Sequence, residues 1–201
     1  SPWGGYGANL QPRRLEKVWQ SCRAMLAGGF PYSEGIFEDL NKVICLQLYW
    51  NPDRSVADIV LEYVAAEFSP AGTAEVTRAV DQLEANMSHG LASGESLREW
   101  HLKLKADPET AAAPSVLYSL NKVSQPEVPL GLLDAAARKM PELAAQSWRW
   151  RLLWLRAALD SELTRSGGVP TETSDGYFEE LGRIACAENA EWAVSTPSRR
   201  I

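Results

Sequence analysis

The sequence has few of the side chains that bind transition metals or act as nucleophiles. Its 201 residues include three cysteines and two histidines, His89 and His101, and no pair of them has the spacing of zinc ligands. Cys22, Cys45 and Cys186 each lie within an apolar helical pattern, which predicts buried free thiols. A Gly-x-Ser-x-Gly motif is absent, and neither histidine has an obvious serine or cysteine partner. We therefore expect no metal site, no cofactor and no nucleophilic triad.

Long apolar runs and a basic stripe are lacking as well. The apolar runs fall far short of the ~20 residues that span a bilayer. The net charge is -6, with Lys and Arg scattered among Asp and Glu, so we expect neither a membrane segment nor a nucleic-acid partner. Residues 1–7 have neither the basic nor the apolar region of a signal peptide. The composition fits a cytoplasmic protein and an exported protein equally.

Helical periodicity dominates what is present. Apolar residues recur at helical spacing, and capping residues, Gly or Pro bound each segment. The pattern predicts a mainly α-helical, bundle-like fold with about seven or eight helices and almost no sheet. The expected helices begin near Pro12, Gly35, Ser55 and Thr73; a short one covers 95–105 and holds His101 as a packing residue; one or two lie between 107 and 129; one runs from Pro141 to about Ser166; and Ser174 opens the last.

The segment SWRWRLLWLRAALDSEL, residues 147–163, predicts the central helix. Apolar side chains cover well over half of its circumference, so most of it must face other parts of the protein. Arg151 lies on an apolar stripe between Trp148 and Leu155. We expect Arg151 to be mostly buried in a structural role, either paired with a carboxylate or stacked on an indole ring.

The stretch PYSEGIFEDLNK, residues 31–42, raises the question of catalysis. Glu34, Glu38 and Asp39 lie at the start of a predicted helix, where carboxylates favour the exposed amides. Glu34 and Glu38 are spaced i, i+4, which brings their Cβ atoms to roughly 5 to 6 Å. Both would approach a sugar from the same side, whereas the acid and nucleophile of a glycosidase flank the scissile bond. These acids are therefore not a self-sufficient catalytic pair.

Aromatic residues in Gly-rich backbone lie close to these acids in the sequence. They are Trp3, Tyr6, Phe30 and Tyr32. Proteins bind sugars by stacking a ring face on the sugar and holding its hydroxyls with charged acceptors. The alternative is that these rings only cover the ends of helices, and the residues alone leave both interpretations open.

The run GGFPYSEGIFEDLNKVICLQLYWNPDRSVADIVLEYVAAEF, residues 28–68, resembles part of large bacterial glycoside-hydrolase-like proteins related to β-N-acetylhexosaminidases and α-glucuronidases. In those proteins the last strand of a (β/α)8, or TIM, barrel enters the last barrel helix. A W-N-P-D turn follows, and a helical domain begins with a motif of the type S-V-x-D-I-V-x-E-Y. The segments SWRWRLLWLRAALDSEL and LGRIACAENA also look like later parts of such chains.

The resemblance implies a last βα unit of a barrel in residues 1–52 and a helical C-terminal domain in residues 53–201. The stretch 29–33 would be the eighth strand, which would explain an extended segment with no neighbour in this chain. Barrel strands end at the active site, so Tyr32 and Glu34, together with Trp3 and Tyr6, would line a sugar site. Strands one to seven, where the resemblance places the catalytic acids, have no counterpart in the sequence.

Two hypotheses follow. In the first, the chain is a C-terminal fragment or subunit of a carbohydrate-active hydrolase and contributes substrate-lining residues without a complete catalytic pair. In the second, it is a non-catalytic helical module that binds a protein or a glycan. Under either hypothesis we expect the isolated chain not to hydrolyse glycosides, because its clustered acids leave one helix end in nearly one direction. Self-association is compatible with both.

Overall fold

The computed structural model describes residues 7–29, 32, 36–87, 125–167 and 169–187. Within these ranges the protein is helical and no strand is present, which confirms the mainly α-helical prediction. Several expectations fall on residues outside these ranges: the segment 3–6, most of the expected strand at 29–33, Glu34, the helix at 95–105 with His101, and most of the span 107–129 where one or two helices are expected. The α-helices are α1 (Pro12–Cys22), α2 (Asp39–Trp50), α3 (Val56–Glu67), α4 (Thr73–Met87), α8 (Glu127–Ala137), α9 (Glu142–Ala145), α10 (Trp148–Arg165) and α11 (Glu172–Ala187), with short 3₁₀ helices η1 (Arg23–Met25), η2 (Ile36–Glu38) and η3 (Pro70–Gly72).

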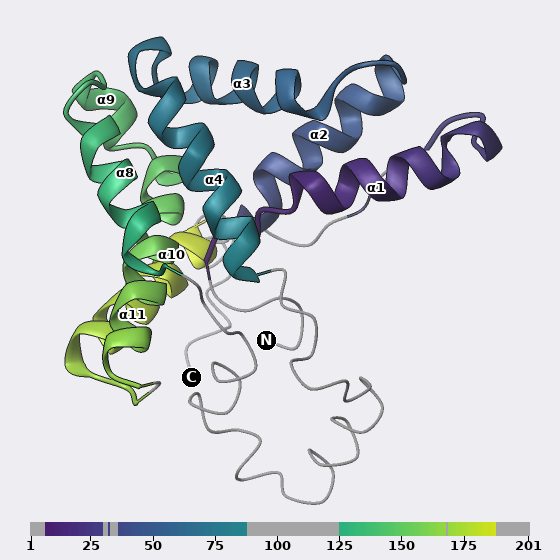
Figure 1. The fold of residues 1–201 in the computed structure, drawn as a ribbon. Coiled ribbons are helices and arrows are strands. Elements are labelled where there is room, and N and C mark those ends of the chain that lie inside the picture. Colours follow the sequence, from purple (N-terminus) through teal and green to yellow (C-terminus); the bar gives the residue numbers. More distant parts are fainter. Residues whose placement is uncertain (1–6, 30–31, 33–35, 88–124, 168, 188–201) are drawn as a thin grey trace, which may run out of the picture.

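The first three helices project from the rest of the molecule (Figure 1). We call α1, η1, α2 and α3 the arm. The C-terminal ends of α1 and α2 point to the same side, and α3 returns along the top of the view toward α4. The helices α4 and α8 lie side by side, α10 packs against α8, and α11 packs against α10 at the end away from the arm.

One main core joins the arm to the other helices. It combines Ile44 of α2, Val60 of α3, Leu83 of α4, Leu133 of α8 and Trp150 of α10 with their buried neighbours. This core takes side chains from both sides of residue 52, so one packed interior spans the boundary predicted between residues 52 and 53. The division into two domains at that position stays a prediction.

A second, smaller core lies between α10 and α11, where Leu181 packs against the leucines of α10. The helix α10 contributes buried side chains to both cores, which confirms that it is the central helix. Its apolar residues lie on nearly all sides because it has packed neighbours on nearly all sides.

Side chains at the helix starts correct two boundaries expected from the sequence. The single helix from Pro141 to Ser166 is wrong. The short α9 ends at Ala145, and Ser147 then caps α10, accepting a hydrogen bond from the Trp150 N–H at 3.2 Å. Residue 174 does not open α11 either. Thr171 and Ser174 hydrogen-bond each other's backbone N–H groups at 3.1 and 2.8 Å, so Thr171 is the cap.

Two further helix starts fall within a residue of expectation. The Ser55 side chain accepts a hydrogen bond from the Asp58 N–H at 3.4 Å, which confirms that Ser55 caps α3. Thr73, expected as a cap, is instead the first residue of α4, because η3 leads directly into that helix. Its hydroxyl donates to the Ser69 carbonyl at 3.1 Å.

The prediction of buried thiols is wrong. All three cysteines are free, but Cys186 is exposed on the last turn of α11, and Cys22 and Cys45 are only half-buried. Their helices carry apolar residues on more faces than the core covers, so helical spacing alone did not place these side chains inside. Partial burial, with the nearby charge of Glu38, raises the pKa of the Cys45 thiol.

Candidate functional site

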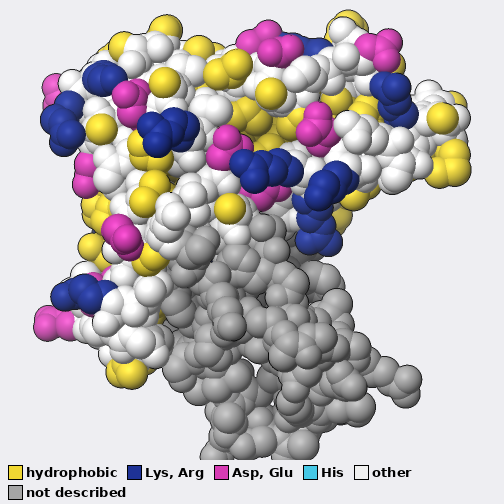
Figure 2. Space-filling view, viewed as in Figure 1, with side chains coloured by type: hydrophobic (Ala, Val, Ile, Leu, Met, Phe, Trp, Pro, Cys, Tyr) yellow, Lys and Arg dark blue, Asp and Glu magenta, His cyan; other side chains and the backbone are white. Residues whose placement is uncertain are grey.

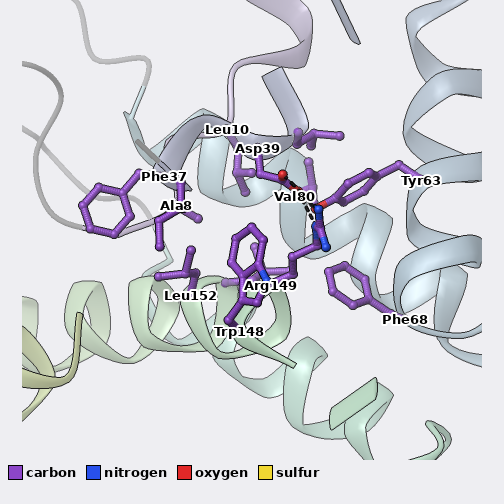
Figure 3. Close-up of a pocket in the computed structure, with 13 residues that line it drawn as sticks. Ala8, Leu10, Phe37, Asp39, Tyr63, Phe68, Val80, Trp148, Arg149 and Leu152 are labelled. Carbon is purple, nitrogen blue, oxygen red and sulfur yellow. Dashed lines mark hydrogen bonds and ion pairs between the residues drawn. The ribbon is translucent and has the colours of Figure 1, made fainter. Parts of the chain in front are cut away.

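The structure separates the acids that the sequence groups together. Glu38 ends η2 and accepts a hydrogen bond from the Asn9 side chain at 3.1 Å, so it holds the segment that leads into α1. Asp39, the first residue of α2, instead points into a pocket beside α10 (Figure 3). Of the residues predicted to contact sugar, Tyr32 is 81% exposed, whereas Trp3, Tyr6 and Glu34 lie outside the described residues.

Asp39 is the centre of a charged cluster formed by three helices. Arg149 of α10 donates from Nε to Asp39 Oδ2 at 2.7 Å and from Nη2 to Oδ1 at 3.3 Å. The Tyr63 hydroxyl of α3 donates to Asp39 Oδ2 at 2.7 Å, and Glu67 Oε2 lies 3.3 Å from Arg149 Nη1. The guanidinium also lies over the Trp148 ring, 4.4 Å from its centroid. Figure 3 shows Asp39, Tyr63 and Arg149 meeting in this way.

Electrostatics in this cluster favour fixed protonation states. The hydrogen bond to Asp39 raises the pKa of Arg149 above its ordinary value. Burial, and then the hydrogen bond to Asp39, raises the pKa of Tyr63. A general acid or base needs a pKa near the working pH, and these two groups move away from it. The cluster therefore joins α2, α3 and α10 without the properties of a proton-transfer site.

The pocket around this cluster is too small for a sugar. Its cavity volume is about 30 Å³, and one water already needs roughly 10–15 Å³. Its walls are mostly apolar and come from the segment before α1, from η2 and α2, from α3 and α4, and from α10; they include Leu10, Phe37 and Leu152. Binding of a sugar ring would require these packed elements to separate.

Arg151 has both of the contacts that the sequence left open. Its guanidinium forms a two-pronged ion pair with Glu180 of α11, with Nη2 to Oε2 at 2.7 Å, and it lies over the Trp154 ring at 4.5 Å from the centroid. The side chain is 37% exposed, so it is partly buried. It lies at the margin of the α10–α11 contact, where its charge keeps access to water.

A more deeply buried ion pair lies in the middle of α10. Arg156 Nε is 3.1 Å from both carboxylate oxygens of Asp160, and the side chains are only 9% and 2% exposed. Gly7, with φ of +97°, passes against Arg156, and a Cβ on it would lie 3.2 Å from Arg156 Cβ. The sequence analysis missed Arg149 and Arg156. Their presence within an otherwise apolar helix was the available signal, since a charge there must be paired.

A group of exposed apolar side chains lies on the arm. Val18 belongs to the C-terminal half of α1, Met25 ends η1, Leu26 follows it, and Leu46 and Trp50 belong to α2. We call these five residues the tip surface. Trp50 is 88% exposed.

Two contacts join the C-terminal part of α1 and η1 to the turn between α2 and α3. Trp19 Nε1 donates to the Pro52 carbonyl at 3.1 Å, and the Arg23 guanidinium is 3.2 Å from Asp53. Apolar side chains are visible at the right-hand end of the molecule in Figure 2, which is the end of the arm. The tip surface therefore combines the ends of α1 and α2.

A second, open hollow lies between the start of α1, α4 and the start of α8. Its volume is about 320 Å³, and its lining includes Arg13, Arg78, Asp81 and Gln125. Arg13 and Asp81 neutralise each other across it at 3.2 Å. The hollow is polar and wide, without an enclosing wall.

Two classes of site are not seen in the part of the chain that the structure describes. No group of three or more His, Cys, Asp or Glu side chains could hold a metal ion there. No helix in the same part is long and apolar enough to cross a membrane.

Comparisons with known proteins give no relative. No protein-family model, no curated protein and no solved structure matches the chain.

Proposed function

We propose that this chain is a non-catalytic helical module that binds a protein partner through the tip surface. The observation that carries the proposal is the exposure of five large apolar side chains on one projecting arm, with Trp50 as the most exposed. Single exposed apolar residues are normal on protein surfaces, but a group of them indicates a contact surface. Tryptophan is among the residues that contribute most to binding when covered by a partner.

The rest of the described structure supports binding over catalysis. The pocket at Asp39 is closed to a substrate by its size, and its polar groups already bind one another. The acids nearest in sequence, Glu38 and Asp39, have different partners on different elements. A glycosidase needs two carboxylates that flank a bond, and these two do not.

The test compares binding by the parent chain with binding by variants of the tip surface. A partner is first isolated with the full chain and then purified, and its Kd is measured for the parent, for Trp50→Ser and for Met25→Ser. We expect each variant to weaken binding by about tenfold or more, because a central apolar contact contributes at least ~1.4 kcal/mol. Leu143→Ser is the matched control, since Leu143 is an equally exposed apolar residue on α9, away from the arm.

Equal affinity of the parent and both tip variants would refute the proposal. So would a loss caused equally by Leu143→Ser, because the effect would then not depend on the arm. Circular dichroism and thermal melts check that each variant folds like the parent, which we expect because these side chains contribute little to the core.

We also propose, from the resemblance, a second candidate function: a C-terminal part of a glycoside-hydrolase-like protein that supplies sugar-lining residues. The exposure of Tyr32 supports it, and the partner of the tip surface would then be the rest of a barrel. The purified chain is assayed against aryl glycosides, including N-acetylglucosaminide and glucuronide, with Glu34→Gln and Glu38→Gln as controls. We expect no turnover by the chain alone. Turnover that either substitution abolishes would make the chain an enzyme in its own right.

A further inference from the structure

Building on the proposed function, we infer that the partner presents an acidic, amphipathic surface to the arm. Residues 12–25, which form α1 and η1, contain four cations (Arg13, Arg14, Lys17 and Arg23) and one acid, Glu16, within a chain of net charge -6. This helix therefore differs in sign from the protein as a whole. Complementary charge is what selects a partner and speeds its association.

Two of these cations are available to a partner. Arg13 is paired with Asp81, and Arg23 with Asp53. Arg14 and Lys17 are exposed and make no ion pair within the described ranges.

The two available cations lie on the same face as part of the tip surface. Val18 follows Arg14 by four residues, and Ser21 follows it by seven, so these residues form one stripe on α1 that also includes Lys17. Leu15 and Trp19, which pack against the core, lie on the adjoining face of α1, since Leu15 precedes Val18 by three residues. The stripe is basic in the N-terminal half of α1 and apolar toward η1, where Met25 is 78% exposed. A helix with acidic and apolar positions at i, i+3, i+4 and i+7 would match both halves.

A second copy of the chain does not fit this surface in a symmetric dimer. Two-fold symmetry would place the same patch on both subunits, so Arg14 and Lys17 would meet either the same cations of the other copy, at a cost in electrostatic repulsion, or its apolar half, where the patch offers no acid to pair with them. An acidic protein segment has no such conflict and can cover the apolar half at the same time.

The experiment uses the full chain and two labelled synthetic peptides of about 20 residues, long enough to cover the helix. Both peptides have leucines on one helical face; one has glutamates on the other face and the other has lysines. Fluorescence anisotropy measures each Kd at low and at high salt. We expect the glutamate peptide to bind the parent at least about tenfold more tightly than the lysine peptide, with the preference declining at high salt.

Variants connect this preference to the arm. Arg14→Glu combined with Lys17→Glu should remove most of the preference for the glutamate peptide, and Trp50→Ser should weaken its binding. Arg138→Glu, a change of an exposed cation on the end of α8, should leave the affinity within about twofold of the parent. Anionic vesicles and a single-stranded RNA are titrated in parallel, and tighter binding of either would refute the inference.

The outcomes distinguish the two proposals. If the lysine peptide binds as well as the glutamate peptide, or neither binds, the acidic partner is refuted. The purified natural partner then decides what remains. If it binds the Arg14→Glu, Lys17→Glu variant as tightly as the parent but binds Trp50→Ser more weakly, the docking function stands and only the inference of an acidic partner fails. If that partner binds Trp50→Ser and Met25→Ser as tightly as the parent, the docking function itself fails.

Discussion

The buried ion pair within α10 gives the sharpest prediction for stability. Substitution Arg156→Met keeps most of the volume of the side chain but leaves Asp160, which is 2% exposed, without its guanidinium. Removing one partner of a buried pair costs about 3–5 kcal/mol in the free energy of unfolding, because the other charge stays desolvated. We expect Arg156→Met to destabilise the protein by about 3 kcal/mol, measured by urea unfolding followed by circular dichroism.

A double variant separates the effect of charge from the effect of packing. Replacing both members, Arg156→Met with Asp160→Leu, removes the desolvated charge, so at least half of the lost stability should return. Arg138→Met, at an exposed position on the end of α8, should change the free energy of unfolding by no more than about 0.5 kcal/mol. The reasoning is refuted if the single variant lies within 1 kcal/mol of the parent, roughly the value for a surface pair, or if the double variant is no more stable than the single one.

Three further predictions concern other contacts. The pKa of Tyr63 is raised in the folded protein, so this residue stabilises the fold below pH ~10, and the contribution is lost as the pH rises above that value. The free energy of unfolding of Tyr63→Phe should therefore fall less than that of the parent as the pH rises above ~10. Identical pH profiles would contradict this. Arg151→Ala should lower the free energy of unfolding by only about 1 kcal/mol, because the pair with Glu180 is partly exposed. The pair lowers the pKa of Glu180, so this difference in stability from the parent should disappear as the pH falls below ~4 and Glu180 is protonated. A difference that stays constant with pH would count against the prediction. Glu84→Ala removes the acceptor of two N–H groups of α1 and should cost about 2 kcal/mol, whereas Glu84→Gln, which keeps one acceptor, should cost less.

The contact made by Glu84 illustrates what a sequence does not contain. Its carboxylate lies 3.0 Å from the N–H groups of Arg13 and Arg14, which are about seventy positions away in the chain. The proline at position 12 already predicts that a helix begins there. The residue that satisfies its first amides depends on α4 passing beside it, and this is a property of the tertiary packing.

Local signals in the sequence indicated most of the described helices and the central one, but not α8 (Glu127–Ala137), most of which lies beyond the helices expected between 107 and 129. Helical spacing, Ser55 as a cap, and apolar residues around most of α10 are local signals, and each corresponds to a feature of the fold. The sequence did not predict the break between α9 and α10. The helical spacing of apolar residues continues through Ser147, so the spacing alone predicts one continuous helix there.

Packing between segments that are distant in the sequence determines which charges meet and which apolar residues stay exposed. Asp39 and Arg149 are separated by 110 positions, and they pair because α2 and α10 cross at one pocket. Met25 and Trp50 look like core residues by type and spacing, but the arm leaves them exposed, since the faces of α1 and α2 that carry them have no neighbouring helix within the described residues. Spacing along a helix fixes which residues share a face, whereas packing between helices fixes whether that face is covered.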